Sequence, residues 1–121
     1  PNQLKDYSTS PNKDLNNASN ATVPEVIFQF SYNALIKLGI TLIAKHGYRA
    51  HSKTGHHTKI IQKLGDILDD QTITTLGNQM RKVRNVDLYS GGSFITEKQA
   101  REYLQFCKQL AHKVKNLIQN K

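Results

Sequence analysis

Hydrophobic residues recur at steps of three and four along most of this chain, which is the spacing of one face of an α-helix. The longest such stretch runs from Thr22 to Gly47. Its apolar positions are Ile27, Phe30, Ala34, Leu35, Leu38 and Leu42, widened by Tyr32, Ile36 and Ile43. A helix with so broad an apolar surface typically lies at the centre of a bundle. Thr22 and Glu25 have the spacing of a capping box, and Gly47 is suited to the left-handed residue after the last turn.

Three further helices follow from the same periodicity. The first covers His56 to about Leu68 and ends at Asp69-Asp70, and the second runs from about Thr72 to Leu88 or Tyr89. The last begins with a capping box at Thr96 and Gln99 and carries a seam at Tyr103, Cys107, Leu110, Val114 and Leu117. No segment alternates between apolar and polar residues for long enough to indicate a strand. The sequence therefore predicts an all-α, up-and-down bundle of four to five helices.

The chain divides into a polar N-terminal segment, residues 1–21, and a helical domain, residues 22–121. Within the polar segment, Pro11–Ala18 could form a short helix with Ser10 as its cap. A length of 121 residues fits one domain, although a sequence that begins at Pro1 could be a piece of a longer protein. The single cysteine, Cys107, falls in the apolar register of the last helix and is expected to be a core thiol. No uninterrupted apolar run reaches the length of a membrane span and no secretory signal is visible, which favours a cytoplasmic protein.

The charge distribution along the chain indicates which kind of partner the protein binds. The formal net charge is +8, and no Asp or Glu occurs between Val26 and Gly65. That stretch holds six cations and four histidines: Lys37, Lys45, Arg49, Lys53, Lys59, Lys63, His46, His51, His56 and His57. An acid-free block of this kind favours a polyanion such as RNA or a nucleotide. The alternatives are a solvated basic surface or, less in keeping with the absence of a spare apolar face, a membrane surface.

His56 and His57 stand at the start of a predicted helix, where backbone N–H groups favour anions. One reading gives them a supporting role in RNA binding or proton transfer. The other has His57 packing or capping while His56 is solvated. Because no cysteine or carboxylate accompanies the histidines, neither a metal site nor a cofactor is predicted.

The densest concentration of charge lies in residues 81–89, at the end of the third strong helix. It combines Arg81, Lys82, Arg84, Asn85 and Tyr89, and the Gly91-Gly92 pair follows. Arg84 could hold a phosphate through paired N–H donors, Asn85 could orient that arginine or a ribose, and Tyr89 could donate a hydrogen bond or stack on a base. The alternative is a plain surface helix in which Arg84 pairs with Asp87.

The segment Arg84-Asn85-Val86-Asp87-Leu88-Tyr89 resembles the signature of the HEPN superfamily. That signature is an arginine followed by a polar residue, with a histidine four to six residues after the arginine. Tyr32-Asn33-Ala34 resembles a Tyr-x-Ala element of the same superfamily. The segments Gly47-Tyr48-Arg49 and Gly55-His56-His57 resemble segments of its small prokaryotic members. The chain departs from the signature in one respect: Tyr89 stands where the histidine is expected, and no histidine lies between Arg84 and His112.

The resemblance implies a metal-independent endoribonuclease of the toxin or phage-defence kind, acting as a homodimer with its arginine motifs in a shared cleft. Arg84, Asn85 and Tyr89 would then be the catalytic set. RNA or phosphate contacts would come from Arg49, Lys53, His56, His57, Arg81 and Lys82. Because a phenol is a poor base at neutral pH, a second reading is a non-catalytic HEPN module. Such a module would bind a nucleotide or a nucleotidyltransferase, which could modify Tyr89. An antitoxin is a further possible partner. A third is a helical interaction domain without a nucleic-acid role.

Overall fold

The computed structural model describes residues 2–47, 56–90 and 95–119, with side chains described for 10–47, 56–85 and 95–119. Five helices account for almost all of this part of the chain, and it contains no strand. They are α1 (Asn2–Asn20), α2 (Pro24–Lys45), α3 (His57–Leu68), α4 (Gln71–Ser90) and α5 (Glu97–Gln119). The predicted all-α helical bundle is confirmed.

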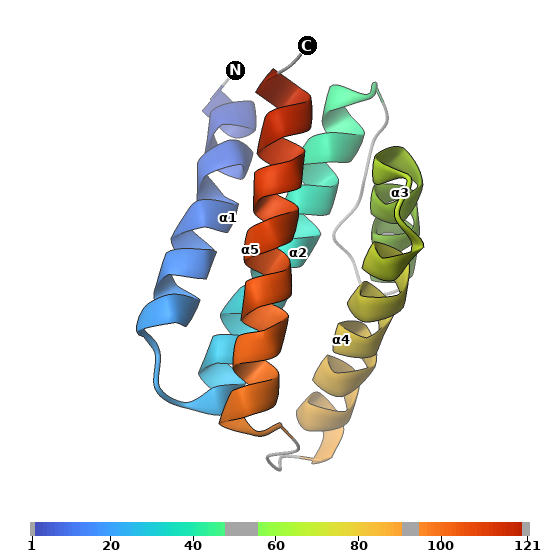
Figure 1. Ribbon diagram of the computed structural model, residues 1–121. Coiled ribbons are helices and arrows are strands. Elements are labelled where there is room, and N and C mark those ends of the chain that lie inside the picture. The colour runs from blue at the N-terminus through green and yellow to red at the C-terminus, as the bar shows by residue number, and fades with distance from the viewer. Residues whose placement is uncertain (1, 48–55, 91–94, 120–121) are drawn as a thin grey trace.

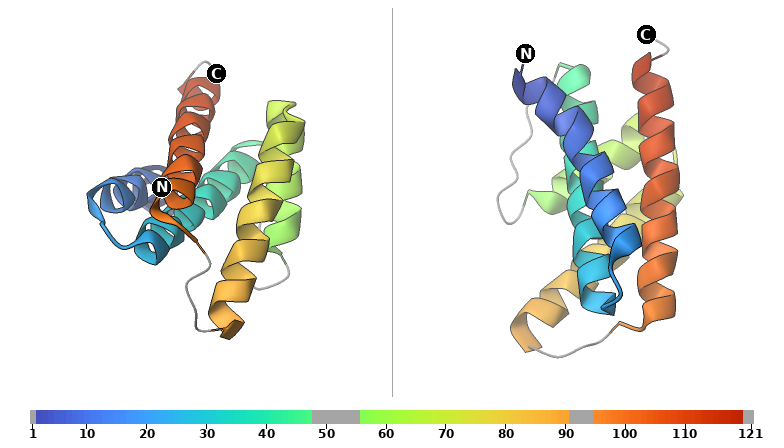
Figure 2. Two further views of the ribbon diagram at one scale, coloured as in Figure 1. Left: turned by 60° about the horizontal axis from the view of Figure 1, so that its bottom comes forward. Right: turned by 90° about the vertical axis from the view of Figure 1, so that its left-hand side faces the viewer.

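Helices α1, α2 and α5 lie side by side, and the α3–α4 hairpin packs across α2 at an angle (Figures 1 and 2). Successive helices do not simply alternate in direction along the chain. Tyr32 of α2 contacts His57 of α3, and Gly39 further along α2 faces Ile60 further along α3. Since both contacts advance together along the two helices, α2 and α3 run in the same direction. This parallel pairing places the first residue of α3 beside the middle of α2.

The centre of the bundle is α2, which packs against each of the other four helices. Its broad apolar surface supplies the largest buried side chains, among them Tyr32, Phe28, Ile27, Leu35 and Leu42. By length and composition alone α2 could also cross a membrane, with a mean hydropathy of 1.5, yet 67% of its apolar window is buried in the bundle. The expectation that no apolar run reaches spanning length is therefore wrong when hydropathy is averaged along α2, because such an average tolerates scattered polar residues.

The N-terminal helix is longer than the sequence predicts. Instead of a short helix capped by Ser10, α1 extends over Asn2–Asn20 with Pro11 in its interior. An interior proline removes one backbone hydrogen bond, but Pro11, Leu15 and Ala18 are buried against the rest of the bundle. Tertiary burial therefore sustains a helix whose own apolar content is thin.

The two predicted capping boxes have opposite outcomes. At α5, Thr96 Oγ1 accepts from the Gln99 backbone N–H and Gln99 Oε1 accepts from that of Thr96, both at 3.1 Å. At α2 the cap is Val23, without a side-chain hydrogen bond, because Pro24 occupies the first helical position. The predicted helix ends agree with the structure: Gly47 has φ +83° and Asp69 has φ 52°.

This contrast gives a matched pair of substitutions. We expect Thr96→Ala to lower the free energy of unfolding by about 1 kcal/mol, because the N-terminal N–H groups of α5 lose a partner. Thr22→Ala, at an exposed residue that caps nothing, should change it by less than about 0.5 kcal/mol. Urea unfolding followed by circular dichroism measures both, and equal losses would contradict the assignment.

Cys107 is fully buried in α5, and burial raises the pKa of its thiol far above the ordinary value. The prediction of a core thiol is confirmed. His112 is exposed on α5, as its place on the polar side of that helix indicates.

Candidate functional site

Tyr32 is the centre of a polar cluster inside the bundle. Its side chain is 1% exposed, and its ring stacks on Phe28 of the same helix with centroids 6.3 Å apart. Its hydroxyl lies 2.9 Å from Nδ1 of His57, the first residue of α3. Burial raises the pKa of Tyr32 to about 12, although Arg84 and Arg81 act in the opposite direction. Tyr32 is therefore a neutral phenol at physiological pH.

Arg84 approaches the same tyrosine from α4. Its Cζ atom lies 5.5 Å from the centre of the Tyr32 ring, a cation–π distance. A guanidinium on an aromatic face retains N–H donors in its own plane for an anion. Ion pairs join Lys37 to Asp14, Arg101 to Glu97 and Lys113 to Asp70, and Arg84 takes part in none of these three. The partner proposed in the surface-helix reading, Asp87, has a side chain outside the described residues.

A hollow of about 280 Å³ opens where these side chains meet. It is lined by Tyr32, Asn33, Ile36, Lys37, Ile40, His57 and Arg84, which come from α2, α3 and α4. The described lining side chains include two cations, Lys37 and Arg84, and one imidazole, and none of the described ones is a carboxylate. Its volume lies at the low end of ligand sites and suits one phosphodiester with its sugar better than an extended small molecule.

The cations of this hollow are not equivalent. The Lys37 ammonium is 2.8 Å from the Asp14 carboxylate and donates to Ser10 Oγ at 2.7 Å, both on α1. Its charge is therefore largely compensated within the fold. Arg84 has no such described partner, so it is the group best placed to bind an incoming anion.

None of the other predicted site residues whose side chains are described lines this hollow. Arg81 lies one turn before Arg84, with Nε donating to Asn78 Oδ1 at 3.3 Å, and Lys82 is exposed. Asn85 is half-buried on α4 and is not among the lining residues of the hollow. His56 is the residue before α3. The backbone of Tyr89 belongs to α4, but its side chain lies outside the described residues, as do Arg49 and Lys53.

Sequence reasoning missed Tyr32 as a site residue and treated it as part of an apolar stripe. The signal was available: a tyrosine in a core stripe usually needs a polar partner for its hydroxyl. The polar side chain on the apolar face of the next helix is His57, which shares that face with Ile61 and Leu64. The ring of His57 packs beside that of Tyr32, with centroids 5.6 Å apart, and a part of His57 in RNA binding or proton transfer stays a prediction.

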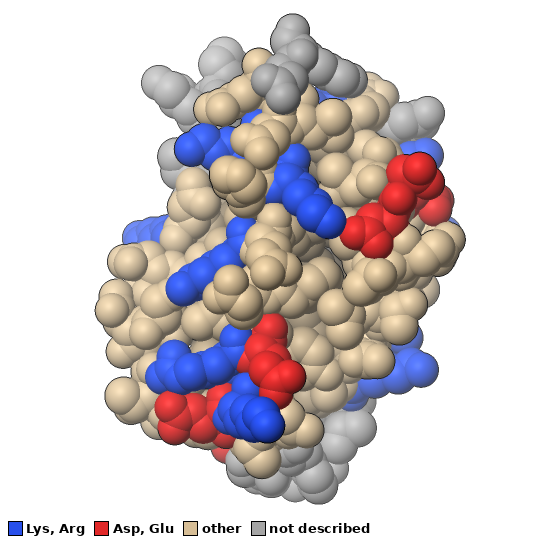
Figure 3. Space-filling model, viewed as in Figure 1, with Lys and Arg blue, Asp and Glu red and all other residues tan. Residues whose placement is uncertain are grey.

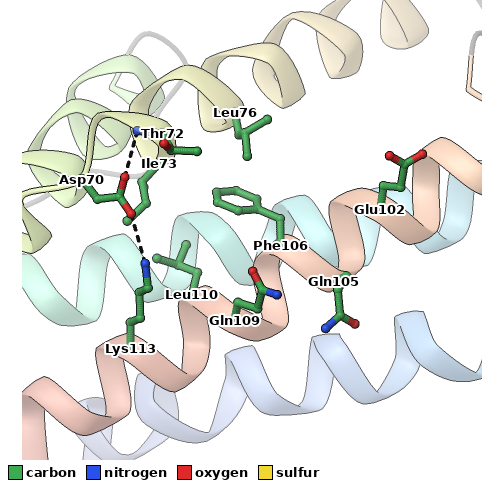
Figure 4. A pocket seen from close by; sticks show the side chains of 10 residues that line it. All are labelled: Asp70, Thr72, Ile73, Leu76, Glu102, Gln105, Phe106, Gln109, Leu110 and Lys113. Atoms are coloured by element: carbon green, nitrogen blue, oxygen red, sulfur yellow. Dashed lines mark hydrogen bonds and ion pairs between the residues drawn. The ribbon is translucent and has the colours of Figure 1, made fainter.

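Two other described parts of the surface are less suited to an anion. A hollow of about 350 Å³ between α4 and α5 has an apolar floor, including Leu76 and Phe106, and its one lysine, Lys113, pairs with Asp70 at 3.0 Å (Figure 4). On the face of the molecule where α5 lies in front, lysine and arginine side chains are mixed with carboxylates (Figure 3). Within the described part of the chain, no group of three or more histidine, cysteine or acidic side chains could hold a metal ion.

The arrangement at Tyr32 can do two things chemically. Arg84 can bind a phosphate oxygen through charge-assisted hydrogen bonds. His57 brings to the same hollow an imidazole, the kind of side chain that ordinarily exchanges a proton near neutral pH. Comparison with protein-family models, with curated proteins and with solved structures finds no match to this chain, so the site rests on its own geometry.

Proposed function

We propose that this protein binds RNA in the hollow at Arg84 and cleaves it without a metal ion, as a cytoplasmic HEPN-like toxin or defence protein. The observation that carries the proposal is the position of the Arg84 guanidinium, over Tyr32 and at the wall of a hollow that it shares with His57. Two further features support it: the net charge of +8 and the resemblance around Arg84. In this proposal the protein acts as a homodimer, and an antitoxin restrains it.

A second function is favoured by the departure at Tyr89. A HEPN-like module without a histidine in its Arg84 segment could bind a nucleotide or a nucleotidyltransferase without turnover. The same hollow, Arg84 included, would then hold the phosphate of the ligand.

A binding and cleavage assay tests the proposal. We expect a fluorescent single-stranded RNA to bind with an affinity that falls steeply between about 50 mM and 200 mM salt, because phosphate contacts release counterions. The RNA should also be cut in the presence of EDTA. Binding without cutting would favour the non-catalytic module, and neither binding nor cutting would refute both nucleic-acid readings.

A further inference from the structure

The ion pair between Lys37 of α2 and Asp14 of α1 joins the Arg84 hollow to the N-terminal helix. Lys37 lines the hollow, yet its Nζ atom lies 2.8 Å from Asp14 Oδ2 and donates to Ser10 Oγ at 2.7 Å. The described lining residues all belong to α2, α3 and α4, and α1 lies on a different side of α2 from the α3–α4 hairpin (Figure 2). Lys37 therefore stands between an anion site and a carboxylate that competes with an incoming anion for the same ammonium group.

Resting on the proposed function of RNA binding at Arg84, we propose that Asp14 limits the affinity of the hollow for phosphate by holding the Lys37 ammonium on α1. When the charge of Asp14 is lost, the Lys37 side chain can turn toward a phosphate that Arg84 binds. The N-terminal helix thereby lowers the RNA affinity of a site to which it contributes no described lining residue.

The two members of the ion pair differ in burial. The side chain of Asp14 is 10% exposed and that of Lys37 is 33% exposed. A carboxylate with so little access to water needs a cation beside it, because an unpaired buried charge is strongly destabilising. Lysine depends less on the pair, since a third of its side chain meets solvent and its four-carbon stem is flexible. The carboxylate is therefore the fixed partner, and the ammonium is the one that can move.

The cation that Asp14 withholds would complement Arg84. The guanidinium presents a planar set of N–H donors, whereas a lysine ammonium acts as a compact point charge with donors that rotate. Both side chains line the same hollow, Arg84 from α4 and Lys37 from α2. Each cation that neutralises a phosphate adds to the dependence of binding on salt. Release of Lys37 should therefore change both the affinity for RNA and its salt dependence.

Anisotropy titrations of the full chain with a fluorescent single-stranded RNA test the proposal. We expect Asp14→Asn to raise the affinity about 3- to 10-fold, the scale of one added hydrogen bond. The slope of log affinity against log salt should steepen by about 0.7, the value of one added phosphate contact on a single strand. Asp66→Asn makes the same change of net charge on the exposed surface of α3, away from the lining of the hollow. It should leave the affinity within about two-fold of the parent, because salt screens exposed charges.

A double-mutant cycle shows whether the gain passes through Lys37. Lys37→Ala should remove the gain from Asp14→Asn, but it should change the parent little, because the parent's ammonium is already paired with Asp14. A pair that only fastens α1 to α2 would lower thermal stability in Asp14→Asn without raising RNA affinity. Should Asp14→Asn fail to fold, Ser10→Ala removes the hydrogen-bond acceptor of Lys37 and keeps the carboxylate. It should raise the affinity in the same direction by a smaller factor, and an unchanged affinity would then refute the role of α1.

Inorganic pyrophosphate distinguishes the failure of this inference from that of the proposed function. A ligand that binds the folded state raises the unfolding temperature, and we expect pyrophosphate to raise that of Asp14→Asn more than that of the parent. If this holds while neither protein binds RNA, the role of Asp14 stands and the RNA function is refuted. If the parent binds RNA and Asp14→Asn binds it no more tightly than Asp66→Asn, only the role of Asp14 is refuted. If neither RNA nor pyrophosphate binds, both are refuted.

Discussion

Arg84→Ala should weaken RNA binding by about 10- to 100-fold, because hydrogen bonds to charged groups contribute about 1.5–3 kcal/mol. Cleavage should fall further, by about 10²- to 10³-fold, if the guanidinium stabilises charge that develops on the phosphate. The slope of log affinity against log salt should also become shallower, since one phosphate contact is lost. Anisotropy titrations and cleavage time courses on the same RNA measure the three effects.

Two further variants separate the shape of the guanidinium from its charge. Arg84→Lys keeps the charge but loses the planar set of donors, so its affinity should lie between those of the parent and Arg84→Ala. Lys108→Ala removes one charge from the exposed surface of α5, away from the lining of the hollow, and should leave cleavage unchanged. If Arg84→Ala binds and cleaves as well as Lys108→Ala, the hollow is not the RNA site.

Gly39→Ala should lower the free energy of unfolding by about 1–3 kcal/mol, the usual cost of an overpacked core. A methyl group at this position of α2 would collide with Cγ2 of Ile60 on α3. Alanine is also a better helix former than glycine by about 1 kcal/mol, which works against the expected loss. A net destabilisation would therefore show that close packing of α2 on α3 outweighs helix propensity.

A double-mutant cycle tests that contact directly. Ile60→Ala alone should cost about 2–5 kcal/mol, but in combination with Gly39→Ala the total should be smaller than the sum by about 0.5–3 kcal/mol. Ile61→Ala is the matched control, because Ile61 instead faces Gly77 of α4, where an added methyl group would lie 2.7 Å from Cγ2 of Ile61. Equal coupling with Ile60 and Ile61 would contradict the packing. Because this contact fixes α3 against α2, Gly39→Ala should also slow RNA cleavage.

Local patterns predicted most of the helices because their signals lie within a few residues. Thr96 and Gln99 cap α5 through bonds that span three residues, and Gly47 ends α2 through its own backbone freedom. The predicted helix starts were wrong where the local sequence signal competed with a second effect. Pro24 moved the start of α2 past Thr22, and burial extended α1 through Pro11.

The candidate site was accessible to prediction only in part. The sequence alone predicts the charge of Arg84 and its place near the end of a helix, and it also predicts the position of His57 at the start of another helix. Their meeting at Tyr32 was not, because it depends on the parallel course of α2 and α3. That course is fixed by long-range contacts such as Gly39 with Ile60, which no local spacing records.

By itself the sequence determined that this chain is helical, basic and built around one broadly apolar helix, because periodicity, capping and charge are properties of neighbouring residues. Only the tertiary structure decided that Arg84, Tyr32 and His57 share one hollow and that Lys37 is compensated by Asp14. Such groupings arise from the packing of whole helices, where a side chain meets partners that lie tens of residues away along the chain.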